Sequence, residues 1–222
     1  MVFTDPPYNV DYSDKNKFLN EADKGNRIQE DIEGDSFEDD EKAKDNLWVP
    51  AFKNMIENSE DDCSIYVTMP QGGTHMMMMM MSVAEAGWKV KHELIWLKNN
   101  HVLGRTDYYY KHEPILYGWN KKHKFYGKGR FNKSVWDIPK PLKSDLHPTM
   151  KPIELIGECL MNSSKEGDKI LDCFGGSGST LIACEQLGRK CYMAELDPHY
   201  CDVIIQRWEN LTGKKAKLIN RS

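Results

Sequence analysis

The sequence lacks a long apolar run, and it does not open with a secretory leader. A membrane-spanning helix needs about 20 consecutive apolar residues, and no stretch of the chain approaches that length. The first residues also lack the pattern of a basic segment, an apolar segment and a small-residue cleavage site. We therefore expect a cytoplasmic protein with no membrane partner.

The sequence has few cysteines and none in a metal-binding or redox pattern. Its six cysteines form no C-x-x-C pair and have no zinc-finger spacing with histidine. Most stand among apolar residues, where free cysteines are commonly buried. We expect reduced, interior thiols and no metal, and keep a redox or metal role as the alternative.

Basic residues are scarce in one part of the chain and acidic residues in another, although the net charge of the 222 residues is only −4. Residues 11–62 hold seventeen acidic and seven basic side chains, whereas residues 98–151 hold twelve basic and four acidic ones. Nine aromatic residues stand within the basic block. This mixture suits a phosphate backbone and unstacked bases. A solvated basic face over an ordinary core is the alternative.

Strand-like and helix-like segments alternate along the chain, which indicates an α/β fold with a parallel sheet. We expect strands at residues 1–4, 63–69, 88–97, 112–119, 168–173, 190–195 and 216–219. We expect helices at residues 48–56, 75–86, 152–161, 179–187 and 198–211, the last opened by Asp197 as N-cap. We expect a basic hairpin or loop at 120–136 and a long polar loop, of the kind that forms lids, at 9–47.

One predicted helix contains an unbroken run of methionines, Met76–Met81. Such a run is apolar on every side of a helix, which implies burial or a partner. Methionine also fills irregular gaps in a core well. We expect core packing, with a ligand or partner surface as the alternative.

The tetrapeptide Asp5–Tyr8 directly follows the first apolar run. Proline fixes its own backbone dihedral and holds the preceding residue extended. The Asp5 carboxylate and the Pro6 carbonyl are therefore presented rigidly, beside the aromatic face of Tyr8. These groups suit a planar base gripped by its amino group. A rigid turn with a side-chain hydrogen bond is the alternative.

A glycine-rich turn, Gly175–Gly178, connects a predicted strand to a helix. Glycines there allow a sharp turn and a close approach to a ligand. No lysine precedes Ser179, so the turn is not a phosphate loop. A dinucleotide fingerprint read from Gly176 also fails, because Leu181 holds its sixth position. The remaining candidate is S-adenosylmethionine, which carries an ammonium, a sulfonium and a ribose but no phosphate.

Two acids stand where such a ligand needs them. Asp172, at the end of a predicted strand, suits the ammonium group. Glu195, 23 residues further along, stands near the spacing of the ribose-binding acid in nucleotide-binding sheets. A capping acid and a solvated strand end are the alternative interpretations.

Together these motifs resemble the amino-group DNA methyltransferases, which methylate adenine N6 or cytosine N4. Their order is the tetrapeptide, a target-recognition stretch, His147–Pro152, the glycine turn and Glu195–Pro198, which resembles the permuted class called β. The resemblance covers nearly the whole chain. The segment Val2–Tyr12 further resembles prophage enzymes that carry a partition-type nuclease-like domain upstream.

The resemblance implies one methyltransferase domain over residues 1–222, with a doubly wound, mostly parallel Rossmann-like sheet and helices on both faces. It divides the chain into a catalytic half (1–97), a target-recognition insert (98–146) and a cofactor-binding half (147–222). Members of this class usually have a Gly-Asp segment, a strand and a helix before the tetrapeptide. We therefore expect that an upstream segment is lacking here.

The resemblance also assigns roles to individual residues. The catalytic pocket would consist of Asp5, Pro6, Pro7 and Tyr8. The cofactor site would consist of Asp172, Phe174, Gly175, Gly176, Gly178, Glu195 and Asp197, with Thr149, Lys151 and Pro152 closing over the methionine portion of S-adenosylmethionine. The partner would be double-stranded DNA with its target base flipped out.

Adenine N6 is the predicted target, because aspartate at the position of Asp5 favours adenine over cytosine in the family. Cytosine N4 and a truncated, inactive DNA-binding domain are the alternatives. RNA or protein-glutamine methylation is disfavoured, since the related protein-glutamine enzymes carry asparagine at that position. The recognition sequence, the biological role (restriction, phage protection or regulation) and the oligomeric state, a homodimer included, are left open.

Overall fold

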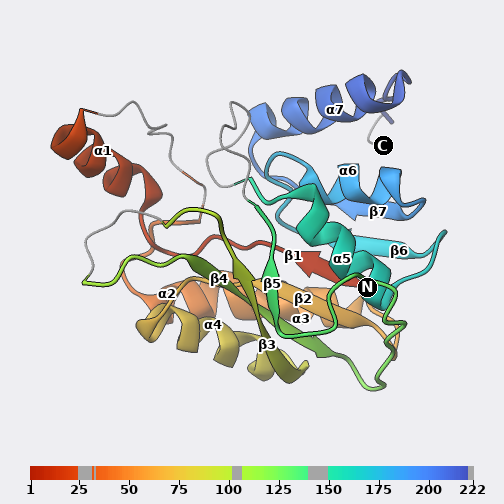
Figure 1. Cartoon of the computed structure of the whole chain (residues 1–222), viewed down its shortest axis with the longest axis horizontal. Helices are drawn as coiled ribbons and strands as arrows, with labels where there is room; N and C mark the ends of the chain where they lie inside the picture. Colours follow the sequence, from red (N-terminus) through yellow and green to blue (C-terminus); the bar gives the residue numbers. More distant parts are fainter. Residues whose placement is uncertain (25–31, 33, 102–106, 140–149, 220–222) are drawn as a thin grey trace.

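The computed structural model describes residues 1–24, 32, 34–101, 107–139 and 150–219. In them, seven strands form one sheet in the order β5-β3-β4-β2-β1-β6-β7 (Figure 1). The strands are β1 (Val2–Thr4), β2 (Ser64–Thr68), β3 (Lys89–Leu97), β4 (His112–Trp119), β5 (Val135–Asp137), β6 (Lys169–Asp172) and β7 (Lys190–Met193). The helices are α1 (Tyr12–Asp23), α2 (Asp40–Ala43), the π-helical turn η1 (Lys44–Trp48), α3 (Val49–Glu57), α4 (Gly73–Glu85), α5 (Ile153–Ser163), α6 (Ser179–Gln186) and α7 (Pro198–Thr212).

The sheet is mostly parallel. Strand β1 pairs in parallel with β2 and β6, β6 pairs in parallel with β7, and β3 pairs in parallel with β5. Among the described strands only β4 is reversed, since it is antiparallel to both β2 and β3. The predicted α/β fold with a mostly parallel sheet is therefore confirmed.

Helices cover both faces of this sheet. Neighbouring strand residues point to opposite faces, and Val2 and Phe3 of β1 accordingly belong to different hydrophobic clusters. The Val2 cluster includes residues of α3 and α4, and the Phe3 cluster includes residues of α5 and α6. Figure 1 shows these two pairs of helices on opposite sides of the strands. This is the doubly wound arrangement that the sequence predicts.

The prediction of a long loop over residues 9–47 is wrong in part. The segment contains α1, α2 and η1. Helix α1 begins where the Asp11 side chain accepts a hydrogen bond from the Asp14 backbone N–H at 3.2 Å. It buries the polar side chains of Ser13 and Asn16, which a search for apolar periodicity does not detect.

One smaller expectation also needs correction, since residues 216–219 form no strand. Of the expected hairpin or loop at 120–136, the structure has the loop over residues 120–134, followed by the short strand β5. The methionine run lies in α4, where Met79 is fully buried while Met77 and Met81 are about half exposed. The six cysteines are all free, and Cys173, Cys191 and Cys201 are only partly buried.

Several strands direct polar side chains to one edge of the sheet. Parallel β1, β2 and β6 end there with Thr4, Thr68 and Asp172, and Asp5 follows β1 directly. Reversed β4 begins at the same edge, because its Ile115 pairs with Thr68. Ligands of parallel sheets bind beyond the carboxyl ends of the strands, so this edge is the place to look for a site. In the described part of the chain, no helix has the length and apolar character that crossing a membrane requires.

Candidate active site

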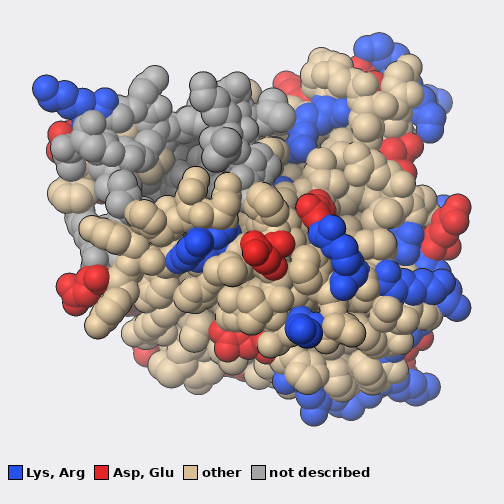
Figure 2. All heavy atoms as spheres, in the orientation of Figure 1, with Lys and Arg blue, Asp and Glu red and all other residues tan. Residues whose placement is uncertain are grey.

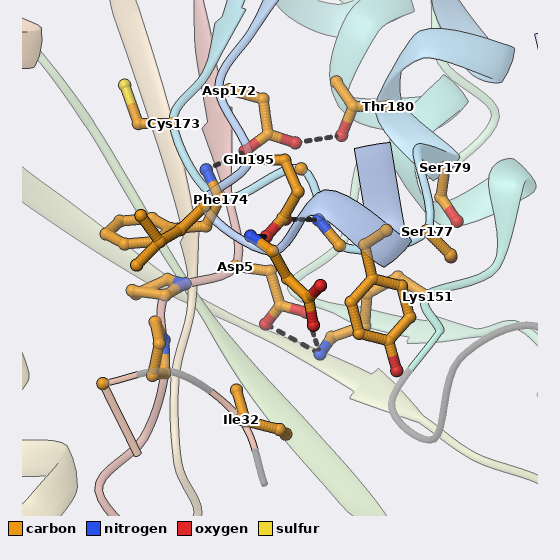
Figure 3. A pocket seen from close by; sticks show the side chains of 18 of the residues that line it. Asp5, Ile32, Lys151, Asp172, Cys173, Phe174, Ser177, Ser179, Thr180 and Glu195 are labelled. Atoms are coloured by element: carbon orange, nitrogen blue, oxygen red, sulfur yellow. Dashed lines mark hydrogen bonds and ion pairs between the residues drawn. The ribbon is translucent and has the colours of Figure 1, made fainter. Parts of the chain in front are cut away.

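A cavity of about 240 Å³ lies at this edge and brings the two distant motifs together (Figure 3). The tetrapeptide Asp5–Tyr8 lines one side, and residues 172–177 line another. The cavity therefore brings residues near the start of the chain together with residues 172–177. The predicted site residues that line it are Asp5, Pro6, Pro7, Tyr8, Lys151, Asp172, Phe174, Gly175, Gly176, Glu195 and Asp197.

Three predicted site residues are placed differently. Gly178 is not a lining residue; it has a φ of 81° at the start of α6, and a Cβ there would lie 3.0 Å from Ile204. Pro152 is buried at the N-cap of α5 and does not line the cavity either. Thr149 lies outside the described residues. The assigned roles of all three in cofactor binding stay predictions.

The Asp5 carboxylate is held by several donors. The Lys151 Nζ lies 2.8 Å from its Oδ1 and 2.7 Å from its Oδ2. The Tyr8 hydroxyl donates to Oδ1 at 3.0 Å, and the Thr68 hydroxyl donates to the same oxygen. Oδ1 thus receives three donors, while Oδ2 receives Lys151 alone among the described residues. Oδ2 therefore keeps room for one more donor.

The contacts continue from Asp5 to a second carboxylate. Glu113, on β4, places Oε1 at 2.9 Å from the Lys151 Nζ and at 3.0 Å from the Tyr8 hydroxyl, whose single proton is shared between Glu113 and Asp5. Its Oε2 lies 3.4 Å from the Lys98 Nζ. Glu113, Lys151 and Lys98 are nearly inaccessible to solvent. Two carboxylates and two ammonium groups thus form one charge-balanced network.

Contacts within the network set the protonation states of Glu113, Lys151 and Tyr8. Burial acts to raise the pKa of Glu113, but the ammonium groups of Lys151 and Lys98 outweigh burial and lower that pKa to about 2. Burial acts to lower the pKa of Lys151, but the carboxylates of Asp5 and Glu113 hold it well above its usual value. Burial and the Asp5 charge raise the pKa of Tyr8 well above its usual value, so Tyr8 remains a phenol.

The sequence prediction missed part of this network. Glu113, Lys98 and Thr68 were not expected near Asp5, and Lys151 was expected at the methionine portion of a cofactor. The structure instead places the Lys151 ammonium on the Asp5 carboxylate. The sequence feature that could have indicated Glu113 is that it is the lone acid within the apolar segment His112–Trp119.

The glycine turn is organised by two acids. Glu195 accepts the backbone N–H of Gly176 at 2.6 Å and that of Asp197 at 2.9 Å, so it ties the turn to the segment after β7. Buried Asp172 accepts the Thr180 hydroxyl at 2.6 Å and the Phe174 N–H at 3.1 Å. Burial raises the pKa of Asp172 to about 7.

One part of the basic block, residues 98–151, lies at the cavity end of the strands, and another part lies at their opposite end. Strand β4 ends at Trp119 opposite Ser64, the first residue of β2, so the segment after it starts at the edge away from the cavity. Lys121 and Lys124 there pair with Asp61 and Asp62, each at 2.8 Å. Acidic and basic side chains are also interspersed over the face of the molecule in Figure 2. Lys121 and Lys124 therefore belong to a solvated, paired surface, which is the alternative that composition left open.

The segment before β4 lies at the cavity edge and differs in its aromatic residues. Tyr108 and Tyr109 are 81% and 54% exposed, whereas Tyr117 and Trp136 are buried in the core. Tyr117 and Trp136 therefore serve core packing. Of the exposed aromatics, Tyr108 and Tyr109 lie between the end of β3 and the start of β4, whereas Phe125, which is 47% exposed, lies in the segment after β4.

Comparisons with known proteins agree with this architecture. The structure resembles that of M1.HpyAVI in complex with SAM (TM-score 0.64, 22% identity, 93% of this chain and 87% of that one). It also resembles the cytosine-N4-specific PvuII DNA methyltransferase (TM-score 0.69, 15% identity, 93% and 78%). At these low sequence identities, the structural similarity shows that the fold is shared.

Sequence comparison identifies the family. The Type II methyltransferase M2.DpnII of Streptococcus pneumoniae is 27% identical over 233 residues, covering 94% of this chain and 82% of that protein. M.Cfr9I of Citrobacter freundii is 30% identical over 151 residues, which is 62% of this chain but only 49% of that protein. The DNA methylase family model for N6 and N4 methyltransferases matches residues 1–207. The chain therefore belongs to the N6/N4 DNA methylase family.

Proposed function

We propose that the protein transfers a methyl group from S-adenosylmethionine to N6 of adenine in DNA. The observation that carries this proposal is the single cavity in which the Asp5 carboxylate lies across from the glycine turn. One wall offers a rigid acceptor for an amino group, and the other offers groups suited to a cationic nucleoside. A methyl transfer needs both in one enclosure.

The glycine-turn wall fits S-adenosylmethionine by its chemistry. Asp172, Glu195 and Asp197 supply carboxylates for a ligand with an ammonium and a ribose, and the described lining residues include no arginine and no lysine except Lys151. Ser179 also lines the cavity, and its buried hydroxyl has no partner in the described structure. When bound, the cofactor supplies an electrophilic methyl group on a sulfonium. We assign its binding to Asp172, Phe174, Gly175, Gly176, Glu195 and Asp197.

Asp5 would act on the target amine. The lone pair of an exocyclic amine is delocalised into the base, so attack requires the nitrogen to become more tetrahedral and more positive. The open Asp5 Oδ2 can accept one N–H and the Pro6 carbonyl the other, which stabilises that developing charge. The Tyr8 hydroxyl is held by Asp5 and Glu113, so the ring is fixed and offers its face to a flipped base.

We assign DNA contact chiefly to the segment before β4, which lies at the cavity edge and exposes Tyr108 and Tyr109. Strand β4 belongs with the catalytic half, because Glu113 joins the Asp5 network. In the proposed division into 1–97, 98–146 and 147–222, strand β4 therefore moves from the middle part to the catalytic part. The order of motifs supports the permuted β class, and the likeness to prophage enzymes rests on residues 2–12 alone.

Nucleoside analysis tests the proposal directly. DNA from a methylation-free host that expresses the protein is digested and analysed by mass spectrometry, with Asp5→Ala as the matched control. We expect N6-methyladenine with the wild type and none with Asp5→Ala. N4-methylcytosine would overturn the choice of base. DNA binding without any methylated base would support an inactive binding domain, and long-read sequencing of the same DNA returns the sequence context.

A further inference from the structure

We propose that Glu113 is a positioning residue of the methyl-transfer site, which holds Lys151 and Tyr8 so that one oxygen of Asp5 stays open for the target amine. This inference rests on the proposed function and deepens it. Glu113 contacts two of the three groups that contact Asp5, namely the Lys151 ammonium at 2.9 Å and the Tyr8 hydroxyl at 3.0 Å. It therefore acts on Asp5 through both of them.

The donors of the Lys151 ammonium are fully used. An ammonium has three N–H groups, and Lys151 has three carboxylate oxygens within 2.9 Å, two from Asp5 and one from Glu113. The ammonium bridges the two Asp5 oxygens, and the pull of Glu113 on its third N–H keeps it there, so that Oδ2 retains a second acceptor site for the amine. Without that pull, the third N–H is free to turn toward Asp5 Oδ2 and to occupy the acceptor site that the amine needs.

The backbone holds both carboxylates rigidly in the same way. Asp5 precedes Pro6, and Glu113 precedes Pro114. A residue before proline is restricted to extended backbone, so the Cα–Cβ bond of each acid is fixed in direction, and the contacts with Lys151 hold the rest of the side chain. Two strands of opposite direction, β1 and β4, thus present a pair of pre-proline acids to one ammonium.

A purely structural role for Glu113 has to be distinguished from positioning. Glu113 also pairs with Lys98, and removal of its charge leaves two buried ammonium groups with Asp5 as their only carboxylate in the network. That imbalance is expected to destabilise the fold by itself. Removing the Lys98 charge in the same protein restores the balance without restoring the pull on Lys151.

The test compares Glu113→Gln, Lys98→Met/Glu113→Gln and Glu158→Gln. Glu158 is a matched control, since it is a buried glutamate of α5 that accepts the Arg130 N–H and does not line the cavity. Each variant is assayed for kcat and KM with DNA, for S-adenosylmethionine affinity by calorimetry, and for Tm.

We expect Glu113→Gln to lower kcat by about 10- to 100-fold, the loss typical of a misplaced reacting group, with cofactor affinity unchanged. The double variant should recover Tm but not kcat. Glu158→Gln should lower Tm and keep kcat. A wild-type kcat in Glu113→Gln, or recovery of kcat in the double variant, would overturn the inference. A wild type without activity on DNA would instead overturn the proposed function itself, and this inference with it.

Discussion

The two walls of the cavity are held together by different interactions. On the Asp5 wall, charged side chains carry the interactions, and the four ions of the network are paired with one another. On the glycine-turn wall, backbone N–H groups are tied to Glu195 and to Asp172, and no basic side chain takes part in these bonds. The Asp5 wall is therefore built for a fixed electrostatic field, and the glycine wall for close approach to a ligand.

This difference predicts different consequences of mutation. A buried ion that loses its partner is costly, so changes on the Asp5 wall should reduce stability and catalysis together. On the glycine wall, a change at Glu195 removes hydrogen bonds to partly exposed groups, so it should reduce cofactor affinity more than stability.

Lys151→Met should have the largest effect. It leaves Asp5 without its ion-pair partner and Glu113 with only Lys98, so we expect a loss of about 3–5 kcal/mol in the free energy of unfolding, measured by urea denaturation. Methyl transfer should also be lost. Lys121→Met, which removes an exposed partner of Asp61, is the control and should change little. Equal stability of the two variants would contradict the contrast between the walls.

Glu195→Ala should have the next largest effect, and this effect is on the affinity for S-adenosylmethionine. Loss of its bonds to Gly176 and Asp197 should weaken S-adenosylmethionine binding by about 10- to 100-fold, the size expected for charge-assisted hydrogen bonds. Calorimetry measures the affinity, and kcat at saturating cofactor should fall less. Glu185→Ala, outside the cavity lining, provides the control. Unchanged affinity in Glu195→Ala would remove this residue from the cofactor site.

A smaller, pH-dependent effect should come from Asp172. Its pKa rises from 3.8 to about 7 in the fold, so the folded protein keeps a proton that the unfolded chain has released between these values. Stability should therefore fall as pH rises through that window. Asp172→Asn cannot titrate, so its Tm advantage over the wild type should grow from pH 5 to pH 8. Parallel Tm curves would show that Asp172 is ionised throughout.

The smallest effects concern DNA binding. Tyr108→Ala, at the cavity edge, should weaken binding by up to about tenfold if the exposed ring stacks on a base. Lys124→Gln, at the opposite edge and paired with Asp62, should leave it nearly unchanged. Fluorescence anisotropy at fixed salt measures both. The reverse ranking would move the DNA-contacting surface to the other edge.

The sequence predicted the fold well where apolar patterns decide it. Strand β1 and helix α7 were expected within one or two residues, because an apolar run marks the first and the Asp197 cap marks the second. Helix α1 was missed because its segment lacks apolar periodicity, and two of its buried side chains, Ser13 and Asn16, are polar.

The residues of the candidate site could be predicted only in part from the sequence. Motif spacing indicated the glycine turn and the tetrapeptide, but composition cannot tell which edge of a sheet a basic residue occupies. Glu113 was missed because only the reversed direction of β4 brings it to the carboxyl edge. The partner of Lys151 was likewise hidden, since 146 residues separate it from Asp5.

The most direct test of the account is calorimetric titration of S-adenosylmethionine into Asp5→Ala, with methyl transfer to DNA assayed on the same preparation. We predict cofactor affinity close to that of the wild type and no transfer, because Asp5 serves the amine and the glycine wall serves the cofactor. Transfer at the wild-type rate, or loss of cofactor binding, would contradict this division of the cavity.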